Sequence, residues 1–319
     1  MNNKGIIFFL DTAHPLLEMG LQEAGYQCIQ ASHLSCEQVL HQLGEAEGII
    51  VRSRIPVDAR LMDAAPRLRF IGRLGSGMEN IDAEYARKRG IHCLNAPEGN
   101  RDAVGEHALG LLLSIMNHLK RGDREVRDGL WRREANRGSE IKGKTISIIG
   151  YGNTGSAFAQ RLRGFEARVL AYDKYKSGFS DDYVQEAQMD QVFEESDILS
   201  LHVPLTDETH YLVNRDYLAR FRKPLWLLNT SRGPVVETRA LLEALDAGKL
   251  QAAGLDVLEY EKKSLEGLDA SAYPEDFTSL IQSEKVLLSP HVAGWTYESL
   301  EKLASVLLQK ILALPQKES

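Results

Sequence analysis

The feature that most constrains the fold of this 319-residue chain is a glycine-rich segment between an apolar stretch and a helix-like stretch. The segment reads Gly150-Tyr-Gly-Asn-Thr-Gly155; it follows Thr145–Ile149 and precedes a helical pattern that begins at Ser156. A second apolar stretch, residues 168–172, ends in Asp173. Strand, glycine turn, helix, strand and acid in this order are typical of a dinucleotide site. The sequence therefore predicts a parallel α/β unit that starts near residue 145.

Each glycine of this segment has a distinct expected role. Gly150 permits the tight turn, Gly152 lets the backbone approach a pyrophosphate, and Gly155 lets the helix pack closely on the strand. The free N–H groups of the helix N-terminus favour a bound phosphate. The carboxylate of Asp173 is expected to accept hydrogen bonds from the ribose hydroxyls and to repel a 2′-phosphate. This favours NAD over NADP, although Lys174 beside the acid weakens that preference.

Short apolar runs alternate with helix-like stretches along most of the chain, and this pattern predicts parallel sheets with helices on both faces. Early strands are expected at 6–10, 48–51, 68–71 and 91–94, and later strands at 145–149, 168–172, 198–203, 225–229, 252–258 and 286–289. Between the two series lie an apolar helix at 102–119 and a polar stretch at 120–137. A helix is expected at 297–314, and residues 259–284 form a polar excursion. We therefore expect two α/β units that meet near residues 100–120.

The composition argues against several classes of partner. The net charge of −7 disfavours a nucleic acid, which requires a basic surface. No apolar stretch is long enough for a membrane span, and no secretion signal is visible at the N-terminus. Three cysteines without a CxxC pair suit reduced thiols, so we expect a cytoplasmic protein.

Polar residues follow three of the later predicted strands, in residues 229–233, 254–261 and 289–294. The carboxyl ends of strands in an open α/β sheet face the ligand. The candidates for chemistry at that edge are Arg232, Asp256, Glu261 and His291.

These residue types suit the oxidation of a 2-hydroxy acid, which removes a hydride from C2 and a proton from the hydroxyl. A histidine titrates near neutral pH and makes a good base, a neighbouring carboxylate orients its ring, and the planar fork of an arginine grips carboxylate and carbonyl oxygens. Other interpretations stay open: an ion pair for Arg232, a buried histidine for His291, and a solvated acid for Glu261, for which Glu259 competes. Asp256 is interpreted as a contact to the nicotinamide or ribose rather than a catalyst.

From about Val51 to Ser299 the sequence resembles the D-isomer-specific 2-hydroxyacid dehydrogenase family. The segments that carry the resemblance, besides those quoted above, are Val51-Arg-Ser-Arg54, Gly72-Arg-Leu-Gly-Ser-Gly77, Asn95-Ala-Pro97, Leu201-His-Val-Pro-Leu-Thr206 and Asn229-Thr-Ser-Arg-Gly-Pro-Val-Val236. The resemblance implies a catalytic set of Arg232, Glu261 and His291, with His291 as the acid/base. The cofactor contacts that it and the glycine motif imply are Gly150, Gly152, Asn153, Thr154, Gly155, Asp173, Val203, Pro204, Thr230, Ser231, Asp256 and Gly294. Substrate contacts are expected from Arg52 and from the backbone N–H groups of Ser76 and Gly77, and no metal is expected.

The resemblance also implies an organisation into two domains. A Rossmann NAD-binding domain is expected at residues 101–292, and a discontinuous, flavodoxin-like substrate domain at residues 1–100 plus 293–319. The long helix from Asp102 and the arm that follows it to Arg137 are expected to form a homodimer.

Within the family, Asp128-Gly-Leu-Trp131 and the basic residues Arg52, Arg54 and Arg73 resemble the subgroup that oxidises 3-phosphoglycerate to 3-phosphohydroxypyruvate in serine biosynthesis. No regulatory domain is expected after the last helix. A reductase of glyoxylate or hydroxypyruvate is the alternative within the family. An NAD-sensing corepressor is the alternative from another class. One departure from the family pattern is Lys262, which stands after Glu261 where a proline is common.

Overall fold

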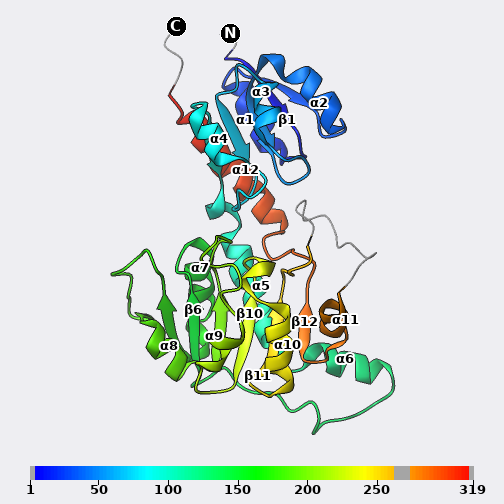
Figure 1. The fold of residues 1–319 in the computed structure, drawn as a ribbon, viewed down its shortest axis with the longest axis vertical. Helices are drawn as coiled ribbons and strands as arrows, with labels where there is room; N and C mark the ends of the chain where they lie inside the picture. Colours follow the sequence, from blue (N-terminus) through cyan, green and yellow to red (C-terminus); the bar gives the residue numbers. More distant parts are fainter. Residues whose placement is uncertain (1–3, 262–273, 316–319) are drawn as a thin grey trace. The chain divides into compact units, whose positions relative to one another are not determined.

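The computed structural model describes residues 4–261 and 274–315, which divide into two compact units. Of these residues, 4–100 and 295–315 belong to the first unit, and 101–261 and 274–294 to the second. Each unit is built on one parallel β-sheet with helices on both faces (Figure 1), which confirms the expected fold class. Residues 262–273, which include Lys262, lie outside the described residues.

The first unit holds a five-stranded sheet in the order β2-β1-β3-β4-β5, the flavodoxin-like order. Its strands are β1 Ile6–Phe9, β2 Gln27–Gln30, β3 Ala46–Val51, β4 Phe70–Arg73 and β5 His92–Asn95. Helices α1 Pro15–Glu23 and α12 Tyr297–Leu312 pack on one face through Leu17, Leu21, Leu303 and Leu307. Helices α2 Cys36–Gln42, α3 Ala59–Asp63 and α4 Ala83–Lys88 cover the other face.

The second unit holds a seven-stranded sheet in the order β12-β11-β10-β9-β6-β7-β8. Its strands are β6 Thr145–Ile149, β7 Arg168–Tyr172, β8 Val184–Glu186, β9 Ile198–Leu201, β10 Leu225–Asn229, β11 Leu250–Leu255 and β12 Val286–Leu288. The strand order reverses between β6 and β9, and open α/β sheets bind ligands beyond the carboxyl ends of the strands at such a point.

Helices enclose this second sheet on both faces. The helix α5 Pro97–Met116 buries Leu112 and Met116 on one face, where α7 Asn153–Arg161 also packs. The opposite face is covered by α8 Met189–Glu195, α9 Arg215–Ala219, α10 Thr238–Asp246 and α11 Glu275–Gln282.

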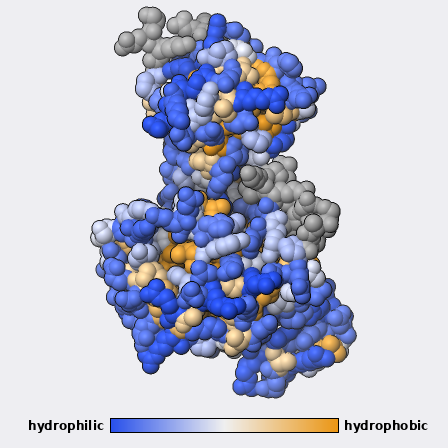
Figure 2. All heavy atoms as spheres, in the orientation of Figure 1, coloured by the Kyte–Doolittle hydropathy of each residue, from blue (hydrophilic) through white to orange (hydrophobic). Residues whose placement is uncertain are grey.

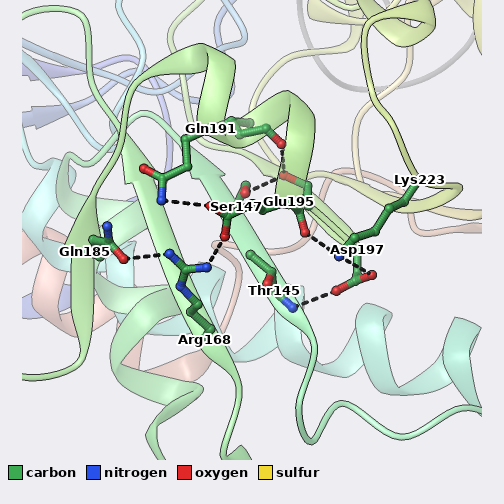
Figure 3. Close-up of polar contacts among 10 residues, drawn as sticks. Thr145, Ser147, Arg168, Gln185, Gln191, Glu195, Asp197 and Lys223 are labelled. Carbon is green, nitrogen blue, oxygen red and sulfur yellow. Dashed lines mark hydrogen bonds and ion pairs between the residues drawn. The ribbon is translucent and has the colours of Figure 1, made fainter.

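Polar contacts tie together the amino-terminal edge of the second sheet (Figure 3). Asp197 accepts a hydrogen bond of 2.9 Å from the backbone N–H of Thr145 and one of 3.1 Å from the ammonium of Lys223. Arg168, at the start of β7, contacts the carboxylate of Glu195. These groups bond to one another at the edge opposite to the glycine-rich loop, so we assign them a structural role.

The structure corrects several expectations about individual elements. The polar stretch after the long helix contains a further helix, α6 Leu119–Arg127, which an Arg127–Asp123 ion pair of 2.8 Å supports one turn apart. The excursion at 259–284 contains α11, which buries Phe277 and Leu280 at helical spacing. The short edge strands β2 and β8 were not expected, because their mixed polar sequences show no apolar run.

The visible surface of the two units is mostly hydrophilic, with small apolar areas (Figure 2). Exposed aromatic side chains include Trp131, Trp295 and Tyr297, which are 78%, 57% and 91% exposed. None of the helices in the described ranges combines the length and the hydropathy that a bilayer crossing requires.

Candidate active site

The glycine-rich loop joins β6 to α7 and needs glycine for close packing at two positions. Gly150 has a φ of +90°, and a Cβ atom there would lie 2.5 Å from the carbonyl oxygen of His202. A Cβ atom at Gly155 would lie 2.1 Å from the carbonyl oxygen of Gly150. At Gly152 a Cβ atom would meet nothing within 4 Å, and no side chain of the described residues caps α7 there. The loop thus presents an open space beside an uncapped helix N-terminus.

A buried histidine contacts the helix that follows this loop. His202 follows β9, stacks on Phe158 with ring centroids 5.5 Å apart, and lies 3.3 Å from the hydroxyl of Thr154. Its other ring nitrogen lies 2.8 Å from the Ser200 hydroxyl. Burial lowers the pKa of His202 to about 3, so its ring is neutral. The half-buried Asn153 and Thr154 therefore stand on a rigid base at the start of α7.

The acid at the end of β7 is held in place by backbone N–H groups. Asp173 accepts hydrogen bonds from Tyr151 at 2.8 Å, Tyr175 at 2.9 Å and Lys176 at 3.1 Å. These bonds fix the orientation of the carboxylate. They leave acceptor capacity on its oxygens for the hydroxyls of a ribose.

The loops after β9 and β10 carry four more of the predicted cofactor residues. Val203 and Pro204 follow β9, and Thr230 and Ser231 follow β10. The Thr230 hydroxyl is buried and has no hydrogen-bond partner among the described residues, whereas Ser231 bonds to Asn229. A ribose or amide would satisfy such a hydroxyl, and a phosphate would satisfy the uncapped helix N-terminus. The residues at this edge therefore fit a dinucleotide.

The predicted acid/base and its carboxylate come together in the structure. The Nδ1 atom of His291 lies 2.6 Å from Oε2 of Glu261, and the two side chains are 23% and 16% exposed. The other carboxylate oxygen of Glu261 accepts from the backbone N–H of Leu258 at 2.5 Å. His291 has a φ of +54°, a conformation that non-glycine residues seldom adopt, and its N–H donates to the Asp256 carbonyl at 2.8 Å. The half-buried Gly294 ends this segment.

Asp256 anchors the loop that presents this histidine. Its carboxylate accepts hydrogen bonds from the Ser289 hydroxyl at 2.5 Å and from the backbone N–H groups of Val292 at 3.0 Å and Ala293 at 2.8 Å. The His107 ring, which sequence reasoning missed, lies 2.9 Å from the Ser289 hydroxyl. Burial acts to raise the pKa of Asp256, but hydrogen bonds from His107, Ser289 and the two N–H groups outweigh it, and the pKa is lowered. The expected contact of Asp256 to the nicotinamide or ribose stays a prediction.

The competing acid, Glu259, has a different environment from that of Glu261. Its carboxylate accepts from the backbone N–H of Thr238 at 3.0 Å, at the start of α10, and from the hydroxyl of Tyr211. The bond from Glu259 raises the pKa of Tyr211 to about 12. These contacts give Glu259 a structural role and leave Glu261 as the partner of His291.

Arg232 lies in the turn after β10, whose last residue pairs with Leu255 at the end of β11. The Asn229 side chain holds this turn by donating to the Arg232 carbonyl at 2.9 Å. A Cβ atom at Gly233 would lie 1.9 Å from the Leu258 carbonyl oxygen, so glycine lets the two loops touch. The turn thus brings Arg232 to the same edge as the loops after β11 and β12.

In the first unit, the three predicted substrate residues follow adjacent strands at the carboxyl edge. Arg52 comes directly after β3, and Ser76 and Gly77 follow β4, whose last residue Arg73 pairs with Val51. Among the described residues, the backbone N–H groups of Ser76 and Gly77 have no hydrogen-bond partner. Two free N–H groups in succession suit an anion.

Two of the three basic residues named from the sequence, Arg52 and Arg54, have different environments. Arg54 directs its guanidinium at the backbone carbonyls of Leu10 and Leu34, with bonds of 2.5 to 3.0 Å, so it is engaged in holding the backbone. The guanidinium of Arg52 instead lies over the ring of Trp295, 4.1 Å from its centroid, and burial lowers the pKa of Arg52. Sequence reasoning missed Trp295, which gave no signal beyond being an aromatic residue four positions after His291.

The fold and this site define a nicotinamide-nucleotide-dependent dehydrogenase. The carboxyl edge of the second sheet carries both a loop that fits a dinucleotide and a histidine, His291, in contact with the carboxylate of Glu261. The family model for the NAD-binding domain of D-isomer specific 2-hydroxyacid dehydrogenases matches residues 109–293. A hydroxypyruvate reductase of Thermotoga maritima is 34% identical over 89% of both chains. A D-3-phosphoglycerate dehydrogenase of Archaeoglobus fulgidus is 33% identical over 94% of this chain and 56% of its own.

Solved structures agree with these matches. The D-lactate dehydrogenase of Aquifex aeolicus, crystallised with NAD and lactic acid, superimposes with a TM-score of 0.80 at 28% identity, over 97% of this chain and 94% of that one. The chain belongs to the D-isomer-specific 2-hydroxyacid dehydrogenase family and is an NAD-dependent enzyme of that family. Members of this family act on small 2-hydroxy and 2-keto acids.

Proposed function

We propose that the protein oxidises D-3-phosphoglycerate to 3-phosphohydroxypyruvate, with NAD as the hydride acceptor, at the first step of serine synthesis. The observation that carries the reaction type is the 2.6 Å contact between His291 and Glu261. The observation that favours an acid with a second negative charge is Arg52, whose guanidinium lies on an aromatic ring and makes no hydrogen bond among the described residues.

In the oxidative direction, His291 takes the proton of the C2 hydroxyl through its Nε2 atom. Glu261 accepts from the Nδ1–H group, which orients the ring and stabilises the positive charge that the ring gains. NAD supplies the acceptor for the C2 hydride. Arg232 binds the carboxylate and the developing keto oxygen through its planar fork. We expect the N–H groups of Ser76 and Gly77 to donate to the substrate carboxylate as well.

The cofactor is held by the second unit. The α7 N-terminus with Gly150, Gly152 and Gly155 receives the pyrophosphate, and Asp173 accepts from the ribose hydroxyls. The remaining contacts come from the start of α7 and from the loops after β9, β10, β11 and β12, through Asn153, Thr154, Val203, Pro204, Thr230, Ser231, Asp256 and Gly294. We propose that residues 101–292 form the NAD-binding domain, and residues 1–100 with 293–319 the substrate domain.

A reductase of hydroxypyruvate or glyoxylate is the second candidate. Arg54 is engaged with backbone carbonyls, so a phosphate would meet fewer basic groups than the sequence predicted. The similarity to the Thermotoga maritima reductase extends over 89% of both chains, which also favours an acid with a single charge.

Two sets of initial rates separate the candidates. The first is NADH formation from D-3-phosphoglycerate and NAD, with the keto product trapped, and the second is NADH oxidation with hydroxypyruvate, glyoxylate and pyruvate. Selective turnover of the phosphorylated acid supports the first proposal. Turnover of unphosphorylated keto acids alone supports the second. Tight NADH binding without turnover of any of these acids would favour an NAD-sensing corepressor.

We also propose a cytoplasmic homodimer. The arm after α5 exposes Trp131 at 78% and Leu119 at 55%, which a second subunit would cover. Light scattering during size-exclusion chromatography tests this: a monomer mass at micromolar concentration would contradict it.

A further inference from the structure

The residue that follows the ribose acid, Lys174, is engaged by a carboxylate from a different loop. Its ammonium lies 2.8 Å from Oε1 of Glu208. The hydroxyl of the next residue, Tyr175, donates to Oε2 of the same carboxylate at 2.6 Å. Both oxygens of Glu208 are thus bound to the loop after β7.

This contact crosses the point where dinucleotides bind in such sheets. Lys174 and Tyr175 follow β7, and Glu208 lies in the loop between β9 and α9. The strands β7 and β9 flank β6 on opposite sides, so the contact spans the carboxyl end of β6, where the strand order reverses.

The loop that carries Glu208 is internally fixed. The Thr209 hydroxyl donates to the Pro204 carbonyl at 2.6 Å and accepts from the backbone N–H of Thr206 at 2.8 Å. On the other side, the backbone N–H groups of Tyr175 and Lys176 bind Asp173. Both partners of the contact therefore stand on ordered backbone, and the pair does not depend on two mobile loops meeting.

We propose that Glu208 determines the choice between NAD and NADP by holding the Lys174 ammonium in an ion pair. The inference rests on the proposed role of Asp173 as the acid that binds the ribose hydroxyls. A free cation next to that acid would attract a 2′-phosphate and would so compensate for the repulsion between the phosphate and Asp173. Glu208 neutralises this cation, so a 2′-phosphate meets the uncompensated charge of Asp173 and no free ammonium.

The test is Glu208→Gln, which retains an acceptor for the Tyr175 hydroxyl and removes the charge. The dissociation constants of NADH and NADPH are measured from nicotinamide fluorescence, without substrate. We expect NADPH to bind the variant about 3- to 5-fold more tightly than it binds the wild type, because an exposed ion pair is worth up to about 1 kcal/mol. NADH affinity should stay within about twofold, and the gain should shrink as salt is raised from about 0.01 M to 0.15 M.

Two further variants make the result specific. Adding Lys174→Ala to Glu208→Gln should abolish the gain, since no ammonium remains to be released. Glu194→Gln, on α8, removes a charge from an exposed ion pair with Arg222 and should leave both constants unchanged. A ratio of NADPH to NADH constants within twofold of the wild type in Glu208→Gln would overturn the inference, as would a gain that persists in the double variant.

The role of Asp173 is tested separately by Asp173→Asn. Weaker NADH binding in that variant supports the ribose assignment, and unchanged binding removes it. Because this result is independent of the constants of Glu208→Gln, failure of the proposed cofactor contact is distinguishable from failure of the proposed selectivity.

Discussion

Replacing Glu261 with glutamine should slow hydroxy-acid oxidation by roughly 10- to 150-fold and leave NADH binding unchanged. Glu261 lies 2.6 Å from Nδ1 of His291, and both side chains are largely removed from solvent. A hydrogen bond between a carboxylate and a charged ring is worth about 1.5–3 kcal/mol. The ring gains its charge only as the substrate hydroxyl loses its proton, so this energy acts mainly on the transition state.

The assay is the initial rate of NADH formation, separated into kcat and kcat/KM, alongside fluorescence titration with NADH. Since the lost interaction develops in the transition state, kcat and kcat/KM should fall together. A single-turnover measurement establishes that the chemical step, and not product release, is the one that slows.

Glu259→Gln provides a matched control two residues earlier in the same loop. Its carboxylate binds Tyr211 and the backbone N–H of Thr238 and has no contact with His291. It should lower the free energy of unfolding by about 1 kcal/mol and change kcat by less than about threefold. The reasoning is refuted if Glu261→Gln stays within threefold of the wild type, or if Glu259→Gln slows oxidation equally.

Three other outcomes are expected. His291→Ala should lower kcat by about 10²- to 10⁴-fold and leave the NADH dissociation constant unchanged; a normal kcat would remove it as the acid/base. Trp295→Leu removes the ring under Arg52 and should raise KM about fivefold for acids with a second charge, with kcat preserved. Trp295→Phe should recover most of this loss, and an equal rise in KM for glyoxylate would contradict the role of Arg52. The pKa of Asp256 is lowered in the folded protein, so its stabilising effect is present above the ordinary value of about 3.9 and is lost as pH falls through the folded value. As pH is lowered from about 7 to about 3, the midpoint temperature of thermal unfolding should fall less for Asp256→Asn than for the wild type. An equal fall in both proteins would count against this assignment.

Local sequence was sufficient to predict the dinucleotide edge. The strands β6, β7 and β10 have the predicted bounds, because they are buried, apolar and followed by turn or polar residues. Gly155 was predictable for a local reason as well, because the carbonyl oxygen of Gly150 leaves no space for a side chain there. At Gly150 the positive φ is local, but the backbone that a side chain would meet is that of His202. The edge strands β2 and β8 were missed because pairing with a neighbouring strand, and not their own sequence, makes them strands.

The choice among like residues depended on long-range contacts. Residue type alone does not distinguish Glu259 from Glu261; the family resemblance favoured Glu261, and the contact with His291, thirty residues later, brings that acid and not Glu259 to the ring. Arg52 and Arg54 likewise stand two residues apart in the sequence, but in the bends after β3 the guanidinium of Arg54 meets backbone carbonyls and that of Arg52 meets Trp295.

What the sequence by itself determined is the order of strands and helices, the glycine positions and the types of chemical group at the strand ends, because these follow from local sterics and hydrophobic periodicity. What only the tertiary structure decided is which charged groups meet. The pairing of Lys174 with Glu208 joins two loops on opposite sides of β6, and no local pattern records it. An ion pair or hydrogen bond requires distances of a few ångströms between residues far apart in the chain, and only the packed sheet sets those distances.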